Sequence, residues 1–311
     1  MNVLHLKYAV EVAENGSINK AAEALYMNQP NLSKAIKELE NSLGITIFSR
    51  TAKGMNVTPE GEEFLRHARK ILRQIDEMEA LYKGGAAAQQ RFSISVPRAS
   101  YISHAFAQFS KGLSNAKTEI YYKETNAMRA IQNIISGDYK LGIVRYAECF
   151  DKYFKSLLEE KGMAFELVAE FQHVLVMSRA HPLADREPLS QTELRPYIEI
   201  AHPDPYVPSL PLTAVRKEEL PGDIDRRVYV FERASQFELL SENTETFMWV
   251  SPIPADTLAR YGLVQKACQD NRRIYRDVLI HKKDYHLTAL DQAFVTELCK
   301  AKRAILDGIT I

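Results

Sequence analysis

The chain has 311 residues, about twice the length of a typical single domain, so two or three packed units are expected. Apolar residues make up 46% of it and charged residues 26%, a composition that excludes a disordered chain. Its 40 basic and 40 acidic side chains cancel, which excludes a protein that coats nucleic acid through charge alone. Any DNA binding must therefore depend on a local surface.

Several functional classes lack their usual signals. No apolar run approaches the about 18 residues of a membrane span, and the N-terminus lacks a basic segment followed by an apolar one. We therefore expect no membrane partner, no secretory signal and a cytoplasmic location. The three cysteines are far apart, so neither a disulfide framework nor a metal site is expected. No nucleophile elbow, zinc-protease, P-loop or dinucleotide motif occurs, which indicates a non-enzyme without a cofactor.

The first 43 residues repeat one spacing, i, i+3, i+4, i+7, which predicts three short helices that share a small core. The repeats are Leu6, Ala9, Val10, Ala13; Ile18, Ala21, Ala22, Leu25; and Leu32, Ala35, Ile36, Leu39. Ser17 is expected to cap the second helix and Asn28 the third, which begins at Gln29-Pro30. Two helices joined by so tight a turn are the sequence form of a helix-turn-helix.

The third helix carries polar side chains on its first two turns, outside its apolar set. Gln can pair with adenine through two hydrogen bonds, Ser and Asn bond either bases or phosphates, and Lys offsets phosphate charge. On the residues alone, a solvated helix face is the alternative. The candidate DNA contacts here are Gln29, Pro30, Asn31, Ser33, Lys34 and Lys37.

Residues 45–57 lean towards β-structure and predict a hairpin wing with a turn at residues 52–55. Arg50 and Lys53 would offset phosphate charge there, with Arg50 at the DNA backbone or minor groove. Thr58-Pro59 then opens a long helix. Its apolar residues have heptad spacing, so the stripe either lies on the chain's own C-terminal domain or pairs with a second copy. The stripe is Phe64, Ala68, Ile71, Ile75, Met78 and Tyr82.

Residues 84–90 are small and uncharged, which is typical of a hinge. Beyond them, strand-like runs alternate with helical ones, which predicts an α/β region with largely parallel sheets. The strand-like runs are 92–96, 119–125, 141–144, 173–177, 197–200, 227–230, 246–250 and 273–281, and helical runs include 127–136 and 287–307. This length exceeds one core, so the expected boundaries are 1–58 for the DNA-binding domain, 59–90 for the linker helix and hinge, 91–165 with 266–311 for lobe 1, and 166–265 for lobe 2.

Ligands of open α/β sheets bind beyond the carboxyl ends of strands, which selects candidate ligand contacts at the ends of the predicted strands. Asn126 could instead be only a helix cap. Arg145, placed after a buried strand, either pairs with a local acid or meets an anionic ligand, and the second case predicts a small organic anion. Tyr101 and His202 would form walls, one from each lobe. The candidates are Ser100, Tyr101, Thr125, Asn126, Arg145 and His202.

Several motifs together resemble the LysR family of bacterial transcriptional regulators. They include Ala21-Ala22-Glu23-Ala24-Leu25, Gln29-Pro30-Asn31-Leu32-Ser33-Lys34 and Thr58-Pro59-x-Gly61, with weaker similarity at residues 137–143 and at His181-Pro182-Leu183-Ala184. Lys34 stands where the family commonly has Arg, which favours a simple phosphate contact over a two-pronged base contact. Around residues 241–252 the family's Gly-x-Gly-Ile pattern is missing.

The resemblance implies a fold class and a set of partners. The fold would be an N-terminal all-α winged helix-turn-helix, a long dimerising linker helix, and an α/β effector domain with two lobes like those of periplasmic binding proteins. The partners would be double-stranded promoter DNA, a small-molecule effector and further copies of the chain, as a dimer and usually a tetramer, with RNA polymerase as another candidate. The alternative is a solute-binding or sensory module without a direct role in transcription.

Overall fold

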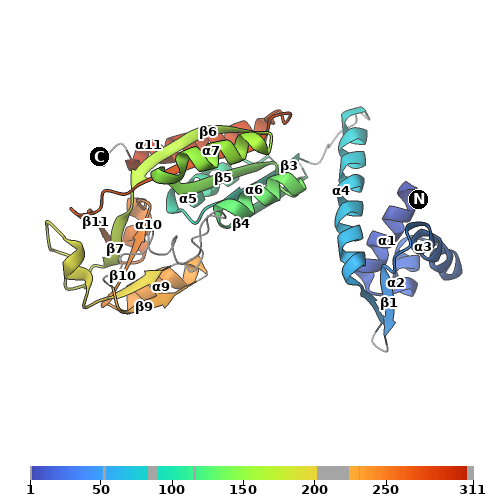
Figure 1. Cartoon of the computed structure of the whole chain (residues 1–311), viewed down its shortest axis with the longest axis horizontal. Coiled ribbons are helices and arrows are strands. Elements are labelled where there is room, and N and C mark those ends of the chain that lie inside the picture. The colour runs from blue at the N-terminus through green and yellow to red at the C-terminus, as the bar shows by residue number, and fades with distance from the viewer. Residues whose placement is uncertain are drawn as a thin grey trace. The chain divides into compact units, whose positions relative to one another are not determined.

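The computed structural model describes residues 2–51, 54–82, 90–114, 117–201, 224–230 and 232–306. The chain divides into two compact units, Met1–Ala88 and Gln89–Ile311, each with its own core (Figure 1). Lys53 and His202 lie outside the described residues, as does the predicted hinge except for Gln90. None of the described helices is long and apolar enough to cross a membrane.

Unit 1 begins with the three predicted helices, α1 (Val3–Asn15), α2 (Ile18–Ala24) and α3 (Gln29–Leu43). Their buried side chains meet in one core, in which Val12 is buried and the expected Val10 only packs at the margin. The Ser17 hydroxyl accepts the Lys20 N–H, as a helix cap should. Asn28 is the N-cap residue of α3, as predicted, although its side chain accepts no hydrogen bond there.

The wing follows as β1 (Phe48–Thr51) and β2 (Gly54–Val57), which pair antiparallel. The Glu40 carboxylate accepts the backbone N–H groups of Ile47 at 2.7 Å and Phe48 at 3.0 Å, which ties the end of α3 to the base of the wing. The long helix α4 (Pro59–Tyr82) buries its first turns in the unit 1 core through Leu65. Further along, Ile71 is 38% exposed and Met78 54% exposed.

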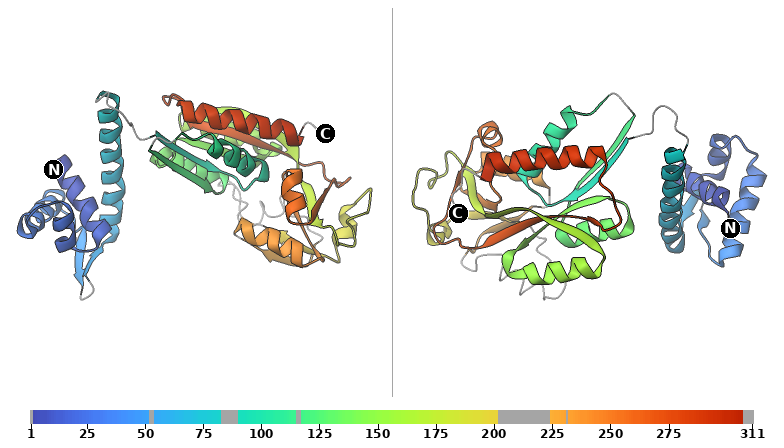
Figure 2. Two further views of the ribbon diagram at one scale, coloured as in Figure 1. Left: turned by 180° about the vertical axis from the view of Figure 1, so that it is seen from behind. Right: turned by 90° about the horizontal axis from the view of Figure 1, so that it is seen from above.

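Lobe 1 of unit 2 is a mixed sheet in the order β4-β3-β5-β12-β6. The strands are β3 (Gln90–Val96), β4 (Thr118–Glu124), β5 (Leu141–Ala147), β6 (Met163–Gln172) and β12 (Ile274–Lys282). Alternate side chains of these strands enter two cores, so helices cover both faces. One face carries α5 (Ser100–Lys111) and α11 (Ala289–Leu306), and the other carries α6 (Ala127–Ser136) and α7 (Asp151–Glu160) (Figure 2).

Lobe 2 is a second mixed sheet, in the order β11-β7-β10-β8-β9. The strands are β7 (Val174–Ser178), β8 (Ile198–Ala201), β9 (Arg227–Tyr229), β10 (Thr246–Val250) and β11 (Leu263–Lys266). One face packs against α9 (Arg233–Glu242) and α10 (Ala255–Arg260), and the other against the loops around Leu183, Leu189 and the 3₁₀ turn η2 (Gln191–Leu194). A shorter 3₁₀ turn, η1 (Glu148–Phe150), precedes α7.

The expectation of largely parallel sheets needs correction. Among the described strands, β12 runs against its neighbours in lobe 1, and β7 runs against its neighbours in lobe 2. Both β7 and β12 are the first strands that the chain forms after it crosses from the other lobe. Each therefore starts at the edge of its sheet where the parallel strands of that sheet end. The first crossing also comes later than expected, because β6 pairs with β12 as far as Gln172, and the return covers residues 267–273.

Candidate DNA-binding surface and effector cavity

The buried side of α3 leaves the predicted polar row facing outward. Leu32, Ile36 and Leu39 fix the helix on its core, so the residues of the other faces are accessible. Lys34 lies 3.8 Å from Glu38, an exposed pair that is too weak to withhold the ammonium group from a phosphate. The exposed members of the row are Pro30, Asn31, Lys34 and Lys37, and the half-buried ones are Gln29 and Ser33.

Tyr26, in the turn between α2 and α3, is a candidate contact that the sequence reasoning missed. Its side chain is 99% exposed, and its backbone has a positive φ of 51°. Packing does not require an aromatic ring in so exposed a place, while a phenol can donate a hydrogen bond to a phosphate oxygen. The sequence signal for this contact is an aromatic residue that lies in the predicted tight turn and belongs to the apolar set of neither the second nor the third helix.

The wing is held against α4 by the Thr-Pro-x-Gly motif. The Thr58 hydroxyl donates to the carbonyl of Thr46 at 2.5 Å and accepts the Gly61 N–H at 3.0 Å. A Cβ atom at Gly61 would lie only 2.2 Å from the Ile47 carbonyl oxygen, so only glycine fits there. Arg50 lies in β1 opposite Met55, in the wing that this motif positions.

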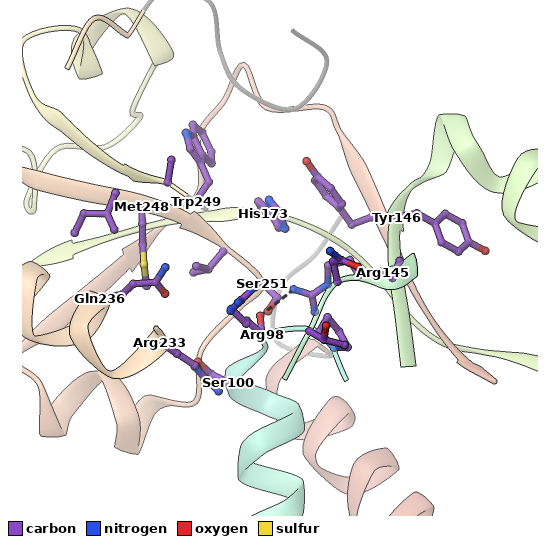
Figure 3. Close-up of a pocket in the computed structure, with 18 of the residues that line it drawn as sticks. Arg98, Ser100, Arg145, Tyr146, His173, Arg233, Gln236, Met248, Trp249 and Ser251 are labelled. Atoms are coloured by element: carbon purple, nitrogen blue, oxygen red, sulfur yellow. Dashed lines mark hydrogen bonds between the residues drawn. The ribbon is translucent and has the colours of Figure 1, made fainter. Parts of the chain in front are cut away.

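A cavity of about 220 Å³ lies between the two lobes of unit 2 (Figure 3). Of the predicted effector contacts, Ser100, Thr125, Asn126 and Arg145 line it. Lobe 1 adds Pro97, Arg98, Ala127, Tyr146, Phe150, Phe154 and Tyr275. Lobe 2 and the crossing segment supply His173, Glu199, Ile200, Ala201, Arg233, Gln236, Phe237, Met248, Trp249, Val250 and Ser251.

Arg145 pairs with a local acid, which was one of its two predicted roles. Its Nε and Nη2 atoms donate to the two carboxylate oxygens of Asp277 at 2.7 and 2.6 Å, and Asp277 is fully buried. The guanidinium also stacks 4.8 Å above the ring of Phe171, and it lies within β5 rather than beyond its end. Its positive charge is therefore already neutralised within lobe 1.

Tyr101 does not form a wall of the cavity, contrary to expectation. It is the second residue of α5, fully buried in the lobe 1 core, and its hydroxyl donates to Asp277 at 2.5 Å. Burial, reinforced by the Asp277 carboxylate, raises the pKa of this phenol well above its ordinary value. The Tyr101 hydroxyl therefore helps to hold the Asp277 carboxylate in the position in which it pairs with Arg145.

Asn126 is a helix cap that also borders the cavity. Its side-chain oxygen accepts the Arg129 N–H at 2.9 Å at the start of α6. Thr125, beside it, is 6% exposed, and its N–H donates to the Val96 carbonyl at 2.8 Å.

Arg233 is a contact between the lobes that the sequence reasoning missed. It begins α9 in lobe 2, yet its guanidinium donates to Glu124 at 2.9 Å, Ser103 at 2.9 Å and Ser100 at 2.5 Å in lobe 1. The Ser100 hydroxyl therefore already has a protein partner. No local signal reveals this contact, because 133 residues separate Ser100 from Arg233 in the sequence.

A family model described as bacterial regulatory helix-turn-helix protein, lysR family, matches residues 3–62. The transcriptional activator AllS of Klebsiella pneumoniae is 31% identical over 197 residues, which cover 62% of this chain and 70% of AllS. The regulator AlsR of Bacillus subtilis (strain 168) is 30% identical over 207 residues, which cover 65% of this chain and 65% of AlsR, slightly less than two thirds of that relative's length.

Two solved structures share the fold over nearly the whole chain. Full-length CbnR complexed with its target DNA gives a TM-score of 0.62 at 18% identity, covering 97% of this chain and 100% of CbnR. A full-length OxyR variant from Pseudomonas aeruginosa gives 0.58 at 16% identity, covering 98% and 96%. These two structures show the shared fold, and the family model together with the relative AllS leads to one assignment: the chain belongs to the LysR family of bacterial transcriptional regulators.

Proposed function

We propose that this protein binds a specific promoter sequence in the cytoplasm and that a small molecule in the inter-lobe cavity alters the promoter complex. The observation that carries the DNA-binding part is α3, whose buried face is fixed to a three-helix core while its polar row is accessible. A helix of this kind fits the major groove. The proposed DNA contacts are Gln29, Pro30, Asn31, Ser33, Lys34 and Lys37, with Arg50 and Lys53 on the wing.

The proposed effector site is the cavity, with Ser100, Thr125, Asn126 and Arg145 in its wall. Its position supports a regulatory role, because a ligand that contacts both lobes favours one arrangement of them over another. The direct contact from Arg233 to Glu124 already joins the lobes, so a ligand there would act on an existing link between them.

Self-association is the third part of the proposal. Ile71 and Met78 expose apolar surface on the stripe of α4, and a second copy of that helix could cover it. A two-fold dimer of this kind would present two copies of α3 to two half-sites, and two such dimers would form a tetramer. RNA polymerase would be a further partner, because it shares the promoter.

A gel shift tests the DNA-binding part. The full-length protein first selects bound fragments from sheared genomic DNA, and it is then titrated onto the most enriched natural fragment and onto a scrambled fragment of the same length and base composition. We expect tighter binding to the natural fragment, by about a thousandfold or more at physiological salt. Equal affinity for both fragments would contradict sequence-specific recognition. Ligand binding without any DNA binding would instead favour a sensory module.

A further inference from the structure

The charges around the cavity are mostly compensated. The Arg145 guanidinium is paired with Asp277 by two hydrogen bonds, and the Arg233 guanidinium is paired with Glu124 at 2.9 Å. Because each guanidinium is paired with a carboxylate of lobe 1, neither arginine brings a net positive charge to a ligand.

The acidic residue in the lining is compensated as well. Glu199 is 2% exposed, and its carboxylate accepts the Arg227 Nε at 2.7 Å. Among the described lining residues, these pairs leave the Arg98 guanidinium as the uncompensated charge. Arg98 follows β3 in lobe 1, lies half-buried in the cavity wall, and makes no side-chain hydrogen bond or ion pair with any described residue (Figure 3).

Lobe 2 contributes a polar group without a partner. Ser251 follows β10, is 1% exposed and lines the same cavity (Figure 3). Its hydroxyl makes no hydrogen bond with any part of the chain that the structure describes. Buried hydroxyls are normally hydrogen-bonded, so a group in the cavity is the expected partner.

We infer that the ligand is a small organic monoanion, a carboxylate with an apolar body, whose charged end Arg98 recognises and Ser251 hydrogen-bonds. This inference rests on the proposed effector role of the cavity. One guanidinium without an acid matches one negative charge, and Arg can hold a carboxylate by two parallel hydrogen bonds. Phe237, Trp249 and Tyr275 supply aromatic surface for the apolar body. The cavity of about 220 Å³ has room for one ring and its carboxylate, since a cavity of about 150 Å³ holds benzene.

The two proposed contacts come from different lobes, Arg98 from lobe 1 and Ser251 from lobe 2. A ligand that binds both would join the lobes at a second place, in addition to the Arg233–Glu124 pair. Arg145 is then a positioning residue for the wall rather than the residue that recognises the charge.

Trp249 makes this testable, because it is the single tryptophan of the chain and it lines the cavity. Its fluorescence is followed while the full-length protein is titrated with benzoate, phenylacetate and hexanoate, and with the neutral amide of each, at constant ionic strength. We expect at least one carboxylate to bind about tenfold or more tighter than its amide. Arg98→Gln should weaken carboxylate binding by about tenfold to a hundredfold and leave amide binding unchanged.

Arg260→Gln is the matched control, because Arg260 is exposed on α10, lies outside the cavity and carries the same charge. It should leave every affinity unchanged. Ser251→Ala should weaken carboxylate binding severalfold, and it provides a second variant if Arg98→Gln does not fold.

Three results would overturn the inference. Amides that bind the wild-type protein as tightly as carboxylates would show that the cavity takes ligands without reading charge, so the proposed effector site would stand. Unchanged carboxylate affinity in folded Arg98→Gln or in Ser251→Ala would reject these residues as contacts. Absence of binding by every compound would reject the inference that the cavity binds a small organic monoanion, and the cavity would lose its support as the effector site. The gel shift would still decide the DNA-binding role separately.

Discussion

Gln29 and Lys37 lie on the same helix but differ in what they can contact. Gln29, in the first turn of α3, can form two hydrogen bonds with one adenine, whereas Lys37 offers a single charge to a phosphate. Gln29→Ala should cost about 1–3 kcal/mol of binding free energy on the specific site and relax the preference at one base pair. Lys37→Ala should weaken binding to all sequences alike and reduce the salt slope by about one. Gel shifts on natural and scrambled DNA measure both, and an equal loss on both fragments for Gln29→Ala would reject its base-reading role.

Arg145 and Arg98 line one cavity, yet their removal should affect stability differently. Arg145→Ala leaves the buried carboxylate of Asp277 without its positively charged partner, so the free energy of unfolding of unit 2 should fall by about 3–5 kcal/mol. Arg98→Ala removes a side chain that has no partner among the described residues, and should cost less than about 1 kcal/mol. Urea unfolding of the two variants gives the comparison. Similar losses would mean that the Arg145–Asp277 pair does not stabilise the fold as proposed.

His181, in the His-Pro-Leu-Ala motif, makes stability depend on pH. It is 3% exposed, and its Nδ1 accepts the Leu183 N–H at 3.0 Å. Burial lowers the pKa of His181 to about 4, against about 6.5 in the unfolded chain. Between these values only the unfolded state binds the proton. The contribution of His181 to stability is therefore fully present above about pH 6.5 and declines as pH falls towards 4, by up to about 3 kcal/mol.

Urea unfolding at several pH values, with His181→Asn as the comparison, checks this prediction. The asparagine oxygen can still accept the Leu183 N–H but does not titrate. The variant should lose stability less steeply than the wild-type protein between pH 6.5 and 4. Parallel stability curves for the two proteins would exclude His181 as the titrating group.

At the scale of elements, the junction between the wing and α4 depends on a glycine. A Cβ at Gly61 would lie 2.2 Å from the Ile47 carbonyl oxygen, so Gly61→Ala must push the wing away from the helix. We expect a loss of about 1–3 kcal/mol in the stability of unit 1 and weaker DNA binding, because the wing moves relative to α3. Gly112→Ala is the control, since its Cβ would meet the Phe109 oxygen at an ordinary 3.5 Å. Calorimetry showing equal effects of the two substitutions would contradict this account.

Local spacing predicted the elements that depend on neighbours in the sequence. The three helices of unit 1, the α6 helix and β10 lie within a few residues of their expected positions. The β6 and β11 strands were not expected as strands, because their residues carry no clear alternation. The order of the strands and the reversal of β7 and β12 depend on the crossings between lobes, which no local pattern records.

The candidate cavity was predictable in its location but not in its charges. The rule for strand ends selected Ser100, Thr125, Asn126 and Arg145, which do line it. The partners that decide what each can bind are distant in sequence: Asp277 lies 132 residues from Arg145. Arg98 has no distinguishing sequence signal, because its role as the uncompensated charge depends on which of its neighbours are paired.

At the scale of the whole molecule, assembly should depend on the exposed part of the α4 stripe. Ile71 is 38% exposed, so replacing it with glutamate should leave the core of the single chain intact. In a helix pair the same substitution would bury a charge in the seam, which is strongly unfavourable. Ile71→Glu should therefore dissociate the assembly while the melting temperature of unit 2 stays unchanged. Gln74→Glu, which adds the same charge at an exposed position outside the stripe, is the control.

Sedimentation velocity over a range of protein concentrations measures the outcome. The wild-type protein and Gln74→Glu should sediment as oligomers, and Ile71→Glu should sediment as a monomer of about 35 kDa, consistent with the chain mass of 35.4 kDa. Because two half-sites are read together only by a dimer, the monomeric variant should also lose most of its affinity for a two-fold operator. If Ile71→Glu sediments like the wild-type protein, the stripe is not the seam between copies, and its apolar residues must be covered within the chain.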